Sequence, residues 1–170
     1  STYGLMVNHT LGNASGFGKI AFQGAYYGQT GKDREGNELD AYHYAAALTY
    51  QKSNLSVTAG YDVLSGNDGS SALGNFKSSK GKNNRFDPLY GTPHKHWGYM
   101  DYFYVGTNSP AGGLNNGYFK IKYATNAISI GADYHSFALN KATKRGDGTV
   151  LSGSLGNEID LLVNYNLNKF

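Results

Sequence analysis

Seven segments of this chain alternate apolar and polar residues with a period of two, and this pattern limits the possible folds more than any other feature. Such alternation is typical of half-buried β-strands, and helical periodicity is nearly absent. The segments are rich in Tyr, Val, Ile and Phe, and Gly, Asn, Ser and Asp bound them. The sequence therefore predicts an all-β, antiparallel fold with strands over 2–11, 17–28, 40–51, 55–63, 117–123, 128–135 and 158–168.

The two faces of these segments differ in chemistry. In the segment 40–51, Tyr42, Leu48 and Tyr50 share one face, whereas His43 and Gln51 share the other. Tyr near both ends of an apolar face is the pattern expected at the two water interfaces of a transmembrane barrel. The opposite face carries ionisable and amide side chains that a packed core accepts only with partners, so we interpret it as a polar lumen. The predicted lumen-lining residues are Lys19, Gln23, His43, Asp62, Lys120, Lys122, Asp133, His135, Glu158 and Asp160.

Strand and loop lengths also favour a transmembrane barrel. The segments run about 10 to 12 residues, close to the length that crosses a bilayer when tilted. Short connections of about 3 to 5 residues alternate with longer ones, as periplasmic turns alternate with extracellular loops. This alternation holds only if 65–113 is one long extracellular loop, so we assign 99–105 to that loop and not to an eighth strand. We predict one antiparallel transmembrane β-barrel domain, or a segment of one, over 1–170, with about 7 to 8 strands.

Composition excludes several classes of protein. An aromatic content of 14% with only 16% charged residues argues against disorder. No apolar run reaches the roughly 18 residues of a membrane-spanning helix, and a mean hydropathy of -0.49 is compatible with alternating transmembrane strands. A net charge of +3 without a concentrated basic patch argues against a nucleic-acid partner. The absence of Cys excludes disulfides, thiolate metal sites and cysteine nucleophiles.

The segment 85–103 carries the most specific motif in the chain, and its sequence is RFDPLYGTPHKHWGYMDYF. It resembles a motif of alginate-export-like outer-membrane porins, written roughly F-x-x-L-Y-G-T-x-H-K-F-x-G-x-M-D-Y-F. The glycine-rich residues 113–116, the strand 131–135 and the segment 155–161 also look like that family. The resemblance covers the second half of the chain by motif and the first half only by pattern.

This resemblance implies a Gram-negative outer-membrane porin. It implies a large, monomeric barrel of roughly 14–18 strands, of which this chain is a C-terminal portion. The 65–113 loop is then expected to fold over or into the channel as a constriction. The expected function is passive passage of small polar or saccharide solutes, and the expected partners are those solutes, outer-membrane lipid and lipopolysaccharide.

The predicted lumen combines three Lys with four carboxylates, which is a mixed lining and not a basic one. Exporters of a polyanion are expected to line the channel with cations, so the solute and the charge selectivity stay open. The charged side chains either pair across neighbouring strands or contact the solute directly. In the loop, cations lie beside aromatic residues, an arrangement that suits sugar rings or a lipopolysaccharide-facing surface. The candidate loop contacts are Lys80, Lys82, Arg85, Asp87, Tyr90, His94, Lys95, Trp97 and Asp101.

Other functions are weaker interpretations of the same residues. A small, closed, eight-stranded barrel acting as an anchor, adhesin or lipid-modifying enzyme is the main alternative, and a soluble ligand-binding barrel is the third. We predict no catalytic residues and no enzyme, because strand alternation places Ser136 on the face opposite His135. His94 and His96 with a nearby Asp lack a clear third ligand, so we predict no metal and no cofactor.

Overall fold

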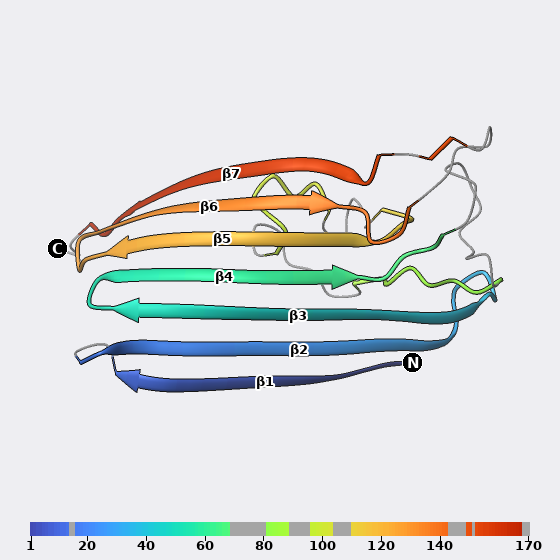
Figure 1. The fold of residues 1–170 in the computed structure, drawn as a ribbon, viewed down its shortest axis with the longest axis horizontal. Helices are drawn as coiled ribbons and strands as arrows, with labels where there is room; N and C mark the ends of the chain where they lie inside the picture. Colours follow the sequence, from blue (N-terminus) through green and yellow to red (C-terminus); the bar gives the residue numbers. More distant parts are fainter. Residues whose placement is uncertain are drawn as a thin grey trace.

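The computed structural model describes residues 1–13, 16–68, 81–88, 96–103, 110–142, 149–150 and 152–167. Its seven strands form one antiparallel sheet in which each strand pairs with its neighbours in the sequence (Figure 1). The predicted all-β, antiparallel fold is confirmed. The strands are β1 (Thr2–Asn13), β2 (Gly18–Lys32), β3 (Glu38–Lys52), β4 (Leu55–Leu64), β5 (Leu114–Ala124), β6 (Ile128–Ala138) and β7 (Ser154–Tyr165).

Each predicted strand corresponds to an observed one, and the observed strands extend further at the end of the sheet that carries the long loops. β2 continues to Lys32 and β3 begins at Glu38, so the polar stretch between the second and third segments is mostly paired strand. Residues 99–103 form bends and turns and no strand, which agrees with their assignment to the loop. Residues 104 and 105 lie outside the described part of the chain.

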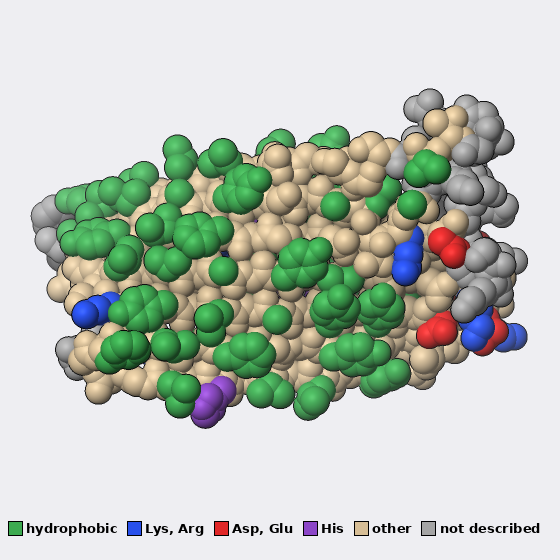
Figure 2. All heavy atoms as spheres, viewed as in Figure 1, with side chains coloured by type: hydrophobic (Ala, Val, Ile, Leu, Met, Phe, Trp, Pro, Cys, Tyr) green, Lys and Arg blue, Asp and Glu red, His purple; other side chains and the backbone are tan. Residues whose placement is uncertain are grey.

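The register gives the sheet an apolar face that is open to the surroundings. Leu48 on β3 lies opposite Phe22 on β2 and Ala59 on β4, and all three belong to this face. Figure 2 shows hydrophobic side chains spread over it across all the strands, whereas Lys, Arg, Asp and Glu appear only near the ends of the sheet. In the described part of the chain no helix has the length and apolarity needed to cross a bilayer.

The sheet is open, with β1 and β7 as its edges. All twelve residues of β1 are exposed, so neither face of this edge strand is covered. Because consecutive strands are antiparallel and their number is odd, β1 and β7 run in the same direction (Figure 1). The two edges therefore cannot close the sheet on itself by the antiparallel pairing that joins all the other strands.

The buried core lies between the polar face and the loop 65–113. Phe86, Trp97 and Phe103 from this loop pack onto the face that the sequence predicts to be polar. They contact apolar residues at the strand ends nearest the long loops, and the cluster consists of Ala41, Leu64, Phe86, Trp97, Phe103, Leu114 and Phe137. The described segments 81–88 and 96–103 of this loop are therefore folded down over the polar face at one end of the sheet.

Candidate functional site

All the residues predicted to line a lumen lie on one face of the sheet. The antiparallel register aligns Lys120 with Thr58 on β4 and with Asp133 on β6, and it aligns His135 with Glu158 on β7. On β2, β3 and β4, the same rule places Lys19, Gln23, His43 and Asp62 on this same face. We call this surface the polar face.

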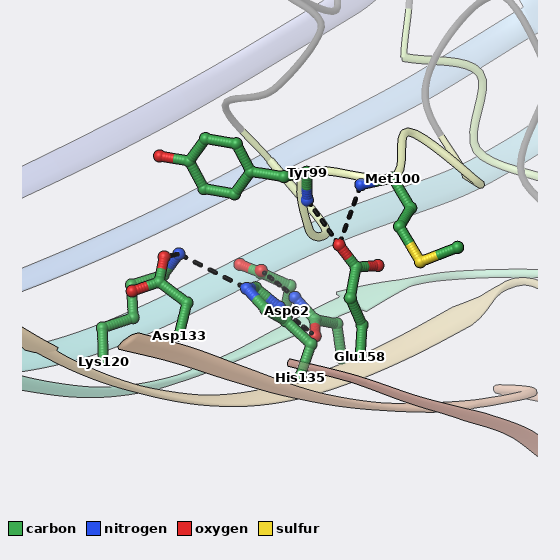
Figure 3. Close-up of polar contacts among 8 residues, drawn as sticks. Asp62, Tyr99, Met100, Lys120, Asp133, His135 and Glu158 are labelled. Carbon is green, nitrogen blue, oxygen red and sulfur yellow. Dashed lines mark hydrogen bonds and ion pairs between the residues drawn. The ribbon is translucent and has the colours of Figure 1, made fainter. Parts of the chain in front are cut away.

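A chain of polar contacts crosses β4, β5 and β6 on the polar face (Figure 3). Asn116 Nδ2 donates to Asp62 Oδ2 at 3.1 Å, and Asn116 Oδ1 lies 3.0 Å from His135 Nδ1. Lys120 Nζ lies 3.3 Å from His135 Nε2 and 2.6 Å from Asp133 Oδ2. Because an ammonium only donates, His135 Nε2 accepts from Lys120 and the ring proton lies on Nδ1, facing Asn116.

Aromatic rings hold this chain of contacts in place. The His135 ring is stacked between Tyr118, at 5.6 Å, and Phe137, at 5.7 Å between ring centroids. Lys120 Nζ lies 5.5 Å from the centroid of the Tyr118 ring, within the range of a cation–π contact. Lys120 and His135 therefore both bond to side chains on a neighbouring strand. This agrees with the interpretation that the charged side chains of the polar face pair across neighbouring strands. Asn116 and Tyr118 were not among the predicted lumen-lining residues, although both alternate in phase with Lys120.

Glu158 on β7 binds the backbone of the loop. Its Oε1 accepts the backbone N–H of Tyr99 at 2.6 Å and that of Met100 at 2.8 Å, as Figure 3 shows. A Cβ at Gly98 would lie 2.3 Å from Glu158 Oε2, and Gly98 has a φ of 86°, so a larger residue would be both strained and in collision. The Glu158 residue is 6% exposed. We call Glu158 and the backbone of 97–100 the carboxylate anchor.

A second part of the loop is fixed to β2 and β3 by neutral hydrogen bonds. The Gln29 side chain donates to the Asp87 carbonyl at 2.7 Å and accepts the Asp87 N–H at 3.0 Å, and Gln29 is 3% exposed. The backbone of Asn83 exchanges hydrogen bonds with Glu38 and Asp40 on β3. We call these contacts of 83–87 with β2 and β3 the amide anchor. Gln29 lies one residue beyond the strand predicted over 17–28, and no sequence signal marked it.

Asp33 closes the turn between β2 and β3 beside the amide anchor. Its Oδ1 accepts the backbone N–H groups of Glu35 and Asn37, and its Oδ2 accepts the side-chain amides of Asn37 and Asn83. The hydrogen bond from the Asn37 side chain is the largest cause that lowers the pKa of Asp33, to about 2. The carboxylate therefore stays ionised and bonded throughout the physiological range.

His43 lies beneath the loop. Its ring stacks on Tyr27 at 5.8 Å between ring centroids and contacts Phe86 at 5.4 Å and Trp97 at 6.2 Å. Trp97 belongs to the motif that carries the family resemblance. Its φ of 58° lies in the left-handed region, a conformation that costs a bulky residue about 1–2 kcal/mol. Trp97 is therefore a packing residue of the loop, because its ring is buried against the polar face.

The other candidate loop contacts have different surroundings. Lys82 Nζ lies 2.7 Å from Glu38 Oε1, an exposed ion pair. Burial lowers the pKa of Arg85, and the nearby charge of Asp87 opposes this shift. Asp101 has a φ of 56° and lies just beyond the carboxylate anchor. Lys80, Tyr90, His94 and Lys95 lie outside the described residues, and within the described ones no three His, Asp or Glu side chains converge as metal ligands.

A cavity of about 320 Å³ opens on the polar face over β4 to β7, toward the end with the short turns. Lys120, Lys122 and Asp133 line it together with Ser and Thr hydroxyls, and Tyr99 of the carboxylate anchor reaches over it. Burial, followed by the charges of Asp133 and Asp160, raises the pKa of Tyr99, so its phenol stays protonated and can donate a hydrogen bond. The loop and the strands thus form one polar site.

Comparison of the chain with models of protein families, with curated proteins and with solved structures finds no match. The resemblance of 85–103 to alginate-export-like porins therefore stays a prediction.

Proposed function

We propose that this chain forms part of the wall of an outer-membrane β-barrel porin, similar to the alginate-export family, that passes small polar or saccharide solutes passively. The observation that carries the proposal is the two-sided sheet, with an open apolar face on one side and a polar face partly covered by its own loop on the other. A soluble protein rarely exposes so continuous an apolar surface, whereas bilayer lipid would cover it.

The distribution of aromatic residues on the apolar face supports a bilayer location. Tyr42 and Tyr50 lie eight residues apart on β3, with Leu48 between them. At about 3.4 Å per residue this separation is about 27 Å along the strand, which at the usual tilt of about 35–45° spans about 19–22 Å of an apolar band about 25 Å tall. Tyr123 and Tyr165 lie at the end with the short turns, as Tyr50 does, and such aromatics suit a water interface.

The open edges support a larger barrel. β1 and β7 leave their backbone donors and acceptors unpaired within the described sheet, which hydrocarbon does not tolerate. Since both edges run in the same direction, antiparallel closure needs an odd number of additional strands. A complete barrel of roughly 14–18 strands meets this condition when the total is even. The polar face then lines the lumen, and the loop acts as a steric and electrostatic filter.

Liposome swelling with the native protein tests the channel. We expect liposomes that contain the protein to swell in isotonic solutions of small sugars, with rates that fall as the sugar grows. Solute entry at the rate of protein-free liposomes would contradict the proposal.

A matched pair of substitutions on β2 tests which face meets the lipid. Phe22 lies on the apolar face and Gln23, its neighbour, lies on the polar face. Phe22→Arg is expected to destabilise the membrane-inserted protein by about 2–4 kcal/mol, since it places a guanidinium among lipid chains. Gln23→Arg should cost much less because it faces water. Urea unfolding in lipid vesicles measures both, and equal effects of the two changes would refute the lipid-facing assignment.

A further inference from the structure

Among the residues that the structure describes, the cavity over β4 to β7 contains one cation without a partner. Lys120 is occupied by Asp133 and His135, and the carboxylate of Glu158 is occupied by the loop backbone. Lys122 lines the same cavity, is exposed, and makes no ion pair or hydrogen bond with any residue that the structure describes. Asp160 lies beside Asp133 on β7 but outside the cavity lining. The pair of Lys120 and Asp133 is neutral overall, so Lys122 leaves the described lining with one positive charge.

The surroundings of Lys122 leave space for a ligand and offer hydrogen bonds to it. Gly131, its neighbour on β6, has no side chain, and a Cβ there would meet its nearest atom only at 3.4 Å. Ser56 is its neighbour on β4. Thr58, Ser129 and Asn164 add two hydroxyls and an amide to the lining, all on the same side of the sheet. The Thr58 hydroxyl pairs with that of Thr49 at 2.8 Å, and Asn164 Nδ2 donates to Ser129 Oγ at 3.4 Å, which leaves further donor and acceptor capacity on each group. Each of these groups both donates and accepts, which suits a hydroxylated molecule.

We propose that this cavity binds a small, hydroxylated carboxylic acid with a single negative charge, and that Lys122 is the counter-charge for its carboxylate. The inference rests on the proposed function and names a solute class for it. A volume of about 320 Å³ limits the ligand to roughly the size of one sugar acid. Tyr99, which the carboxylate anchor holds over the cavity, closes it from the loop side.

The limit to a single charge follows from the pairing of the other ionisable groups. A second carboxylate on the ligand would find no free cation among the described lining residues, because Lys120 is already bonded to Asp133 at 2.6 Å. It would instead approach the carboxylate of Asp133, and like charges at short range in a partly buried site repel strongly. The site therefore selects a monoanion over both a neutral polyol and a polyanion.

Three C6 compounds with the same hydroxylated chain test this selection: sorbitol without a carboxylate, gluconate with one and glucarate with two. Binding to the native protein in detergent micelles is measured by ligand-observed NMR, which requires no transport. We expect gluconate to bind about tenfold or more tightly than either of the others, as one charge-assisted hydrogen bond allows. Equal affinity for sorbitol and gluconate, or tightest binding of glucarate, would overturn the proposal.

Two single-charge variants assign the effect to Lys122. Lys122→Gln is expected to weaken gluconate binding about tenfold while leaving sorbitol unchanged. Lys52→Gln, at the exposed end of β3 and outside the cavity lining, removes the same charge and should leave gluconate binding unchanged. Equal losses of gluconate affinity in the two variants would mean that only the overall charge of the protein matters, and would refute the proposed binding site.

The binding and transport experiments separate the two proposals. Gluconate binding that depends on Lys122, in a protein that produces no liposome swelling, would support the site and refute the channel. Swelling with small sugars, in a protein whose gluconate binding does not depend on Lys122, would support the channel and refute the site.

Discussion

The loop over the polar face is fixed at two places by different chemistry. The amide anchor is redundant, because it consists of two independent pairs of hydrogen bonds. Gln29 on β2 makes two to the backbone of Asp87, and the backbone of Asn83 makes two to the backbone of β3. In the carboxylate anchor one atom, Glu158 Oε1, accepts two backbone N–H groups, and the neighbouring Asp160 carboxyl contacts both Glu158 and the Tyr99 backbone. A distributed set of neutral bonds survives the loss of one member, whereas a single charged acceptor does not. The two anchors should therefore respond very differently to single substitutions.

The largest effect is expected at the carboxylate anchor. Glu158→Ala leaves the Tyr99 and Met100 N–H groups without their acceptor and should weaken local docking by about 3 kcal/mol, since both bonds are charge-assisted. Amide hydrogen exchange should show the Tyr99 and Met100 amides exchanging about 100-fold faster.

Glu158→Gln is the matched control, because its amide oxygen still accepts both N–H groups without the charge. Amide hydrogen exchange at Tyr99 and Met100 should accelerate less in Glu158→Gln than in Glu158→Ala. Unchanged exchange at Tyr99 and Met100 in Glu158→Ala would show that the aromatic packing of Trp97 and Phe103 alone holds the segment.

A smaller effect is expected at the amide anchor. Gln29→Ala removes two neutral hydrogen bonds and should weaken the docking of Asp87 by about 1–2 kcal/mol. Hydrogen exchange at the Asp87 amide should rise about tenfold, while the Asn83 amide, bonded to the Glu38 carbonyl, stays protected. Simultaneous loss of protection at both amides would contradict the idea that this anchor is redundant.

The smallest effect is a response to acid at the turn beside the amide anchor. The pKa of Asp33 is lowered to about 2, from a usual value of 3.8. A lowered pKa means that the carboxylate stabilises the turn above about pH 4, and that this stabilisation is lost as the pH falls from about 4 to 2. The NMR shift of the Asn37 amide proton should titrate with this midpoint. Asp33→Asn should remove the titration, and a midpoint near 4 in the native protein would show that the hydrogen bonds do not stabilise the ionised form.

The sequence predicts the sheet and the grouping of the polar residues well, for a simple physical reason. Alternation is a local property of a strand, so a period of two is enough to place Lys120, Asp133 and His135 on one face before any partner is known. The ends of β2 and β3 were harder to predict, because Thr30 and Leu39 lie in a polar stretch where pairing continues without an apolar pattern.

The roles of individual residues were less predictable. Glu158 and Gln29 bond to backbone groups 58 or 59 residues away, and no spacing rule connects such positions. A backbone N–H has no sequence signature, so a side chain that binds one resembles any other polar residue of the strand. Gly98 was the available signal, since a glycine between Trp97 and Tyr99 marks a close approach of the backbone to another group.

The meander order of the sheet has a consequence for how the protein assembles. Each strand pairs only with its neighbours in the sequence, so hairpins such as β3 with β4 bring together residues that are close along the chain. Both anchors include contacts between residues 58 or 59 apart and require strands that are already in place. Contacts between distant residues lose more chain entropy on closure, so the loop is expected to dock after the hairpins form. The sheet is thus in place before the loop covers its polar face.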